Sequence, residues 1–406
     1  MAEKMELRDI EVWDGNMAAS QALRQAQVDV VAAYPITPST PIVENYGNFT
    51  ANGYVDGEFV MTESEHGAMS CCIGAAAAGG RVATATSSQG FALMVETLYS
   101  ASGMRLPIIL NVVNRALGAP LNVNGDHSDM YLGRDSGWIQ IDAFNAQQAY
   151  DLNLIAFKVA EDHDVRLPAM VHQDGFMTSH TAQGVKTLPD DVAYQFVGDF
   201  KPMNDMLDLD HPVTHGVQTE EDWHFEHKAR QQHALMTTVL PKIQNAFDEF
   251  EKLTGRKYNL VEKFNMDDAD LAIVCMGTAV ETASVVASEL RAQGIRAGVV
   301  GIRVFRPWPF EQIAEALKGC KAIAALDRSS PHGTVGALYN ELCGALFNAD
   351  TKAVMTNYIY GLGGRDLTKA HVNGIFEDLK ANMEAGKPTT PLQQYIGLRG
   401  PKLSFF

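Results

Sequence analysis

The sequence predicts an α/β protein built on a parallel sheet with helices on both faces, followed by a second, smaller α/β unit. Between residues 12 and 180, short runs rich in β-branched residues alternate with longer runs of small or amphipathic residues, a pattern typical of βα units. The alternation resumes at Asp270 and lasts for about 100 residues, enough for a compact three-layer unit. The length of 406 residues fits two or three domains with a large core.

The first block is expected to contain five strands, and helices alternate with them along the chain. The apolar runs that predict strands are residues 28–34, 57–62, 81–87, 107–113 and 167–172. The runs that predict helices are residues 16–26, 65–78 and 91–103, each with Gly or Asp near its ends.

The region between the blocks loses this alternation. Residues 190–217 contain two prolines and a cluster of aspartates, which predicts an ordered excursion or linker over the surface. Residues 219–253 then form a long polar run with helical periodicity. In the second block, strands are expected at 271–276, 297–302 and 322–326, and helices at 282–293 and 313–317.

The composition excludes several classes of function. Thirty-two basic and 49 acidic residues give a formal charge of −17, so the mean surface field repels nucleic acid and anionic lipid. The longest apolar stretch, residues 271–280, falls short of the roughly 18 to 20 residues that a membrane helix needs. The charged N-terminal residues lack the apolar core of a signal peptide. We therefore expect a cytoplasmic protein that binds neither membrane nor nucleic acid.

The five cysteines do not suggest a metal centre. No CxxC pair and no run typical of an iron–sulfur cluster or structural zinc is present in the sequence. We expect buried free thiols.

Four polar features follow predicted strands, where ligands bind to parallel sheets. The loop 34–41 contains three prolines around Thr37, and Glu65 stands where a strand gives way to a helix. Ser88 lies in a turn rich in hydroxyls and glycine, which can present donors to a cofactor. Arg115 ends another strand and suits a planar carboxylate, which it can bind through two parallel hydrogen bonds.

Each feature also has a purely structural explanation. The proline loop can be a rigid turn, Glu65 can interact with the helix dipole, Ser88 can cap its helix, and Arg115 can form a surface ion pair. The acidic stretch 126–129 lacks the ligand count of a calcium loop and is expected to organise a local turn.

Taken in order, these segments resemble the α subunit of the pyruvate:ferredoxin oxidoreductase family. The matching motifs are residues 34–38 (YPITP), 63–68 (ESEHGA), 86–90 (TSSQG), 114–116 (NRA) and 126–129 (DHSD), and the similarity continues through 174–176 and the second block. The resemblance implies a pyrimidine-binding domain of a thiamine enzyme, followed by a domain like the C-terminal domain of transketolase. We place these domains at residues 1–255 and 256–406.

The resemblance also implies the roles of individual residues. Glu65 falls on the glutamate that hydrogen-bonds the aminopyrimidine ring of thiamine diphosphate, and Pro35 on the loop against the cofactor. Thr37 and Arg115 fall on the residues that hold the carboxylate and keto group of a 2-oxo acid. The acyl group passes to coenzyme A.

The rest of the machinery is expected on partner subunits. The sequence lacks the GDG motif with a downstream Asn that holds magnesium and the diphosphate in thiamine enzymes. The resemblance therefore implies a β subunit with the Mg-diphosphate site, iron–sulfur and γ-type subunits, and a possible flavin (FAD) and NAD subunit. No metal site is expected on this chain.

The choice of 2-oxo acid is open at this stage. Residues 12–15, 122–127 and 220–224 resemble NADH-dependent phenylglyoxylate dehydrogenase, which implies oxidation of phenylglyoxylate to benzoyl-CoA and CO2 with electrons passing to NAD. The alternative is a pyruvate:ferredoxin oxidoreductase that produces acetyl-CoA. Oxalate is disfavoured because its specific relatives carry arginine at the position of Thr37. A non-catalytic scaffold subunit is a further alternative.

Overall fold

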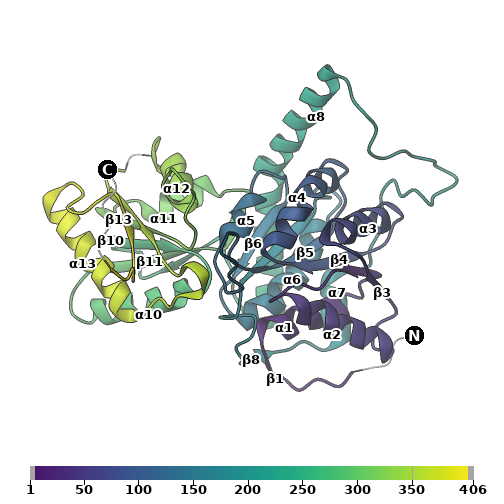
Figure 1. The fold of residues 1–406 in the computed structure, drawn as a ribbon, viewed down its shortest axis with the longest axis horizontal. Coiled ribbons are helices and arrows are strands. Elements are labelled where there is room, and N and C mark those ends of the chain that lie inside the picture. Colours follow the sequence, from purple (N-terminus) through teal and green to yellow (C-terminus); the bar gives the residue numbers. More distant parts are fainter. Residues whose placement is uncertain (1–4, 350, 401–406) are drawn as a thin grey trace.

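The computed structural model describes residues 5–349 and 351–400 and contains two main sheets (Figure 1). The larger sheet has seven strands, and all neighbours pair in parallel except β12, which is antiparallel to β6. The order across this sheet is β12 (Val304–Arg306), β6 (Ile139–Ala143), β7 (Ala169–Asp174), β5 (Ile109–Asn114), β4 (Val82–Thr86), β2 (Val30–Ala33) and β3 (Glu58–Met61).

Helices cover both faces of this sheet because successive strand residues point to opposite sides. In β5, Ile109 and Val113 join one core, whereas Leu110 and Val112 join the other. The first core is covered by α1 (Gly15–Gln25), α2 (Thr40–Ala51) and α6 (Ala146–Ala160). The second is covered by α3 (Glu65–Ala77) and α4 (Ser88–Gly103), and α4 packs on the short α5 (Ser128–Leu132).

The smaller sheet has six strands, and β9 is its antiparallel edge. Its order is β15 (Gln393–Tyr395), β14 (Val354–Ile359), β13 (Ala322–Asp327), β10 (Leu271–Cys275), β11 (Ala297–Ile302) and β9 (Val261–Phe264). On one face lie α10 (Ala279–Arg291) and α13 (Lys369–Ala385), and α11 (Phe310–Leu317) packs beside α12 (Ala337–Leu346) on the other. A 3-10 turn spans Leu362–Gly364.

The remaining elements lie around the larger sheet. The strands β1 (Ile10–Trp13) and β8 (Gln183–Lys186) form an antiparallel pair, and α7 (Asp190–Val197) follows β8. A long helix then runs through α8 (Glu221–Ala234), a π-helical turn (Leu235–Val239) and α9 (Leu240–Thr254). In Figure 1, α8 projects from the body of the molecule, and none of its residues is buried.

The predicted α/β class is confirmed, and most predicted elements lie within a few residues of the observed ones. The sequence analysis missed β6 and α6, and it also missed α2, which has Pro41 in its first turn, where proline is tolerated. The prediction of a linker over 190–217 was wrong at its start. Residues 190–197 instead form α7. Two aspartates stand in its first turn, where their negative charges interact favourably with the positive end of the helix dipole.

The cysteines are free thiols, as expected, but they are not all buried. Three of them, Cys72, Cys275 and Cys320, are buried, whereas Cys71 and Cys343 are partly exposed. Burial raises the pKa of Cys72 and of Cys320 to about 12, so these two thiols stay protonated and unreactive at neutral pH.

The division at residues 255 and 256 remains a proposal. It falls between α9, which packs on α6, and β9, which belongs to the smaller sheet. One strand crosses it, because β12 follows β11 in the chain but pairs with β6 of the larger sheet. No helix in the described part of the chain is long and apolar enough to span a bilayer.

Phe305 of β12 offers a test of this crossing. Its ring is fully buried, with its centroid 5.2 Å from that of Tyr131 and 5.6 Å from that of Trp308. Phe305→Ala should lower the free energy of unfolding by about 3 to 5 kcal/mol because it leaves a cavity between the two domains. Urea unfolding followed by tryptophan fluorescence measures this change.

The matched control is Phe347→Ala, which removes a ring that is 88% exposed. It should change stability by no more than about 0.5 kcal/mol. Equal effects of the two substitutions would contradict the importance of the β12 crossing.

Candidate active site

The carboxyl ends of β2, β3, β4 and β5 bring the predicted site residues to one edge of the larger sheet. Because these strands are parallel neighbours, the loops that follow them emerge side by side. The loop after β2 exposes Pro35 and Thr37. Asn16 fixes this loop, because its Nδ2 donates a hydrogen bond to the carbonyl of Pro38 at 2.8 Å. Thr37 and Pro35 are therefore accessible to a ligand.

Glu65 begins α3 and is 7% exposed. Ser64 caps the helix by accepting a hydrogen bond from the backbone N–H of Gly67 at 3.1 Å. A Cβ added at Gly90 would lie 2.5 Å from Oε1 of Glu65, so α4 can pass this carboxylate only with glycine there. Among residues 5–349 and 351–400, none donates a hydrogen bond to the Glu65 carboxylate.

Arg115 meets the proline loop directly. Its Nη1 donates to the backbone carbonyl of Thr37 at 2.8 Å, and its Nη2 donates to Oε1 of Gln89 at 3.2 Å. The side chain is largely buried, and burial lowers the pKa of Arg115, although the nearby carboxylates of Asp129 and Glu65 oppose this shift. The structure thus brings Thr37, Glu65 and Arg115 to the same edge.

Ser88 begins α4 and is not exposed at this edge. Its side chain is fully buried, and its hydroxyl donates to the carbonyl of Ala116 at 2.5 Å. Its φ of +47° lies in the left-handed region, which is uncommon for a residue other than glycine. The binding of cofactor by Ser88 itself stays a prediction.

Several buried polar atoms at this edge have no partner within the part of the chain that the structure describes. They are Oγ1 of Thr86, Oγ of Ser87, Oδ1 of Asn114 and Nε of Arg115. Unsatisfied buried polar atoms are costly and rare, so several at one edge are typical of a site that receives a polar ligand. Together with the Glu65 carboxylate, they fit a polar heterocycle and an anionic substrate.

The sequence analysis missed Asp129 as a component of this site. Asp126 does organise a local turn, as expected, because its Oδ1 accepts a hydrogen bond from the backbone N–H of Ser128 at 3.0 Å. Asp129, however, is fully buried and accepts hydrogen bonds from the backbone N–H groups of Ser88 and Arg115, both at 2.9 Å. Only the density of acidic residues in 126–129 signalled it in the sequence.

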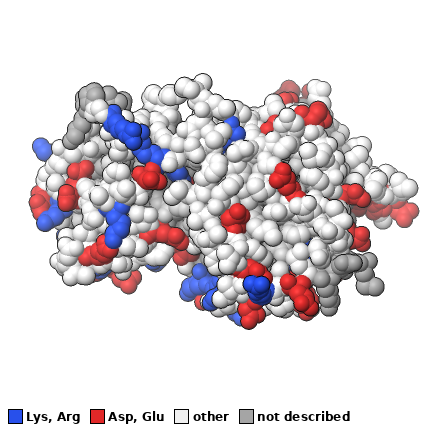
Figure 2. Space-filling model, turned by 60° about the horizontal axis from the view of Figure 1, so that its bottom comes forward, with Lys and Arg blue, Asp and Glu red and all other residues white. Residues whose placement is uncertain are grey.

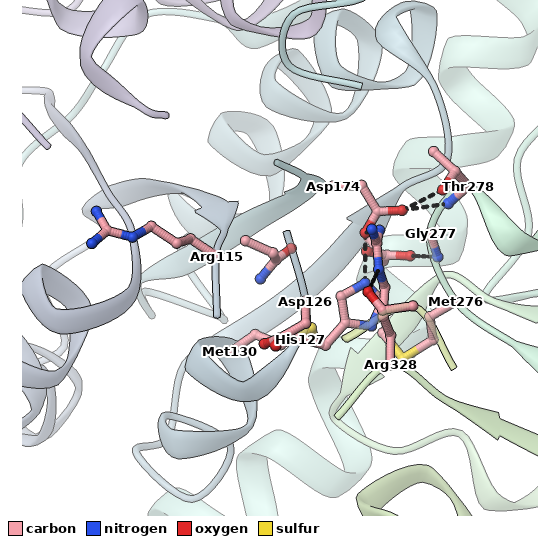
Figure 3. Close-up of polar contacts among 12 residues, drawn as sticks. Arg115, Asp126, His127, Met130, Asp174, Met276, Gly277, Thr278 and Arg328 are labelled. Atoms are coloured by element: carbon pink, nitrogen blue, oxygen red, sulfur yellow. Dashed lines mark hydrogen bonds and ion pairs between the residues drawn. The ribbon is translucent and has the colours of Figure 1, made fainter. Parts of the chain in front are cut away.

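A second buried group joins the two domains beside this site (Figure 3). Asp174 lies 2.7 Å from Nε2 of His127 and 2.9 Å from Nη1 of Arg328, and it accepts hydrogen bonds from N and Oγ1 of Thr278. Burial alone raises the pKa of Asp174, but Arg328 and His127 outweigh it and hold this pKa well below its usual value. In Figure 3, Arg115 points away from this group.

No metal centre appears among the described residues, which contain no group of three or more His, Cys, Asp or Glu side chains placed to hold an ion. The magnesium and diphosphate site on another subunit therefore remains a prediction.

The fold and this edge define an α/β unit with a polar site at the carboxyl ends of its parallel strands, and comparison with protein families identifies the class to which it belongs. Residues 21–245 match the thiamine diphosphate-binding domain of pyruvate flavodoxin/ferredoxin oxidoreductases. Residues 269–372 match core domain II of pyruvate:ferredoxin oxidoreductase. The chain belongs to the pyruvate:ferredoxin oxidoreductase family.

Individual relatives bear on which 2-oxo acid the family member uses. The chain is 46% identical over 386 residues to pyruvate synthase subunit PorA of Thermotoga maritima, covering 95% of this chain and 97% of the relative. It is 42% identical to ketoisovalerate oxidoreductase subunit VorA of Pyrococcus abyssi, covering 95% and 97%. These relatives do not support the resemblance to phenylglyoxylate dehydrogenase, and they favour the pyruvate alternative.

A solved structure shares the fold. The 2-oxoglutarate:ferredoxin oxidoreductase of Magnetococcus marinus superposes with a TM-score of 0.70 at 19% identity. The match covers 93% of this chain and 66% of that one, so our chain spans just under two thirds of the solved chain.

Gly90 tests the placement of Glu65. Gly90→Ala puts a methyl group 2.5 Å from Oε1 of Glu65 and 2.6 Å from Oγ1 of Thr86, so the carboxylate has to move. Turnover of 2-oxo acid by the assembled complex should fall about tenfold or more, because small displacements of reacting groups are costly.

Gly103→Ala is the control in the same helix, since a Cβ there meets no atom within 4 Å. It should leave turnover unchanged. If Gly90→Ala were equally active in a normally assembled complex, Glu65 would not need its present position.

Proposed function

We propose that this chain is the α subunit of a coenzyme A-acylating 2-oxo-acid:ferredoxin oxidoreductase, with pyruvate as the leading substrate. The observation that carries the proposal is the grouping of the Glu65 carboxylate and the Arg115 guanidinium at one strand edge, beside buried polar atoms that have no partner among the residues that the structure describes. The similarity to a pyruvate synthase subunit and to a ketoisovalerate oxidoreductase subunit supports a short 2-oxo acid as the substrate.

Glu65 is suited to accept a hydrogen bond from a protonated ring nitrogen of a heterocycle. Its buried carboxylate, with no donor among the described residues, can accept a hydrogen bond from a ring nitrogen of the aminopyrimidine. Thiamine diphosphate, when bound, supplies the carbanion chemistry that decarboxylates 2-oxo acids. The contribution of Glu65 would be to stabilise the imino tautomer of the ring, whose exocyclic imine nitrogen can take up a proton.

Arg115 and Thr37 are suited to bind the substrate. The guanidinium offers Nε and its unshared N–H groups to a carboxylate, and Thr37 exposes its hydroxyl on the loop that Arg115 anchors. Their role is to orient the scissile carboxylate of the 2-oxo acid until CO2 leaves. Coenzyme A then accepts the acyl group, and the electrons released pass to iron–sulfur partners.

A second subunit is needed to complete the cofactor site. Exposed apolar side chains stand at two of the strand ends, because Met61 is the last residue of β3 and Tyr34 directly follows β2. Figure 2 shows that one face of the molecule carries broad areas without charged side chains, despite the net charge of −17. We assign the diphosphate and its magnesium to a β subunit that covers the strand ends, and the clusters to further subunits.

Glu65→Gln tests the central step. The amide keeps the size of the side chain but not its charge, so turnover should fall by about 10² to 10⁴-fold. The rate of ferredoxin reduction with pyruvate and coenzyme A, compared between the variant and wild-type complexes, measures this loss. Co-purification of the subunits checks assembly.

Glu96→Gln on α4 is the control, because the side chain of Glu96 is 87% exposed. It should retain full activity. A fully active Glu65→Gln complex would remove Glu65 from the mechanism.

The substrate is tested by offering pyruvate, 2-oxoisovalerate and phenylglyoxylate to the complex, each with ferredoxin and with NAD. Acetyl-CoA, identified by mass, should form fastest, with ferredoxin reduced. Preferred formation of another acyl-CoA would keep the reaction class but change the substrate. No acyl-CoA from any of the three would contradict the proposed function.

A further inference from the structure

The buried carboxylate of Asp129 ties together the segments that present Arg115. Its Oδ2 accepts from the backbone N–H groups of Ser88 and Arg115, and its Oδ1 accepts from Nδ2 of Asn114, all at 2.9 Å. Oδ1 also accepts from the N–H of Met130 at 2.8 Å. One side chain therefore fixes the end of β5 against the start of α4.

These same segments hold the guanidinium of Arg115. Gln89, whose Oε1 accepts from Nη2 of Arg115, directly follows Ser88, and the backbone of Arg115 is fixed by Asp129. Ser88 keeps its unusual φ of +47° while its N–H donates to Asp129 and its hydroxyl donates to Ala116. Loss of the carboxylate would free the backbone of Arg115 and the turn that carries Gln89, while the bond from Nη1 of Arg115 to the carbonyl of Thr37 would remain.

The second domain fixes the segment that carries Asp129. The backbone N–H of His127 donates to the carbonyl of Arg328 at 2.8 Å, and the N–H of Gly364 donates to the carbonyl of Gly125 at 2.9 Å. Nδ2 of Asn122 also donates to the carbonyl of Gly363 at 3.2 Å. The segment 122–129 thus bridges the second domain and the strand edge of the first.

We propose that Asp129 is a positioning residue that sets the guanidinium of Arg115 for the carboxylate of the 2-oxo acid. This inference rests on the proposed function. Asp129 acts through Arg115, Ser88 and Gln89 and not on the substrate, because it is fully buried beneath them. The bridge from the second domain keeps the carboxylate in place during turnover.

The test is a double-mutant cycle on the assembled complex. Asp129→Asn keeps the shape of the side chain but replaces an acceptor with a donor that faces backbone N–H groups. We expect kcat/KM for the 2-oxo acid to fall about tenfold to a hundredfold, mainly through KM, while KM for coenzyme A stays unchanged. The same substitution in an Arg115→Lys background should have no further effect, because the residues act as a unit.

If a variant turns over too slowly for kinetics, the double-mutant cycle can be measured through ligand binding instead. Calorimetric titration of oxamate, a non-reacting isostere of pyruvate, into each complex should show the same non-additive pattern in the dissociation constant. If Asp129→Asn prevents assembly, Asn114→Ser removes one donor to Asp129 and should give a smaller effect of the same kind.

The outcomes separate this inference from the proposed function. Additive effects of Asp129→Asn and Arg115→Lys, or equal losses for the 2-oxo acid and coenzyme A, would overturn the positioning role while leaving the function intact. A wild-type complex that turns over no 2-oxo acid would overturn the function itself.

Discussion

Asp174 shares its buried carboxylate between the two domains, and the site geometry depends on that contact. It ends β7 of the larger sheet, while Thr278 and Arg328 follow β10 and β13 of the smaller one. Removing one partner of a buried ion pair costs about 3 to 5 kcal/mol, since the remaining charge is left without compensation. The carboxyl ends of both sets of strands therefore meet at one junction.

This junction explains why polar residues from distant parts of the sequence converge. His127 contacts Asp174, and two residues later Asp129 reaches the strand edge that carries Arg115. Burial raises the pKa of Asp129 to about 6, although the N–H donors around it favour its charged form. Within three residues, this segment thus contacts the carboxylate at the domain junction through His127 and supplies a second carboxylate, Asp129, to the strand edge of the first domain.

Much of the fold and part of the site could be predicted from the sequence. The apolar runs of β4 and β10 stand out because both faces of each strand are buried. The grouping of Thr37, Glu65 and Arg115 could be predicted because residues that follow parallel strands lie at one edge, whereas their roles rest on the family resemblance.

Other features depend on contacts between distant residues, which periodicity does not record. Asp129 looked like part of a local turn because its donors, Ser88 and Arg115, come from other loops. Ser88 combines a buried hydroxyl with a positive φ, and no residue pattern indicated either feature. The prediction of an aryl substrate rested on short stretches of similar sequence. The relatives that match nearly the whole chain are instead named for pyruvate and ketoisovalerate.

The pairing of β12 with β6 has a consequence for biosynthesis. The other strands of the larger sheet are all translated well before β12, so the edge of β6 stays open while the ribosome makes the linking helix and the first strands of the second domain. An open strand edge is a template for pairing with other chains. Nascent chains of this protein are therefore exposed to mispairing at β6 until Val304–Arg306 emerge, and a chaperone that shields this edge would protect them during that interval.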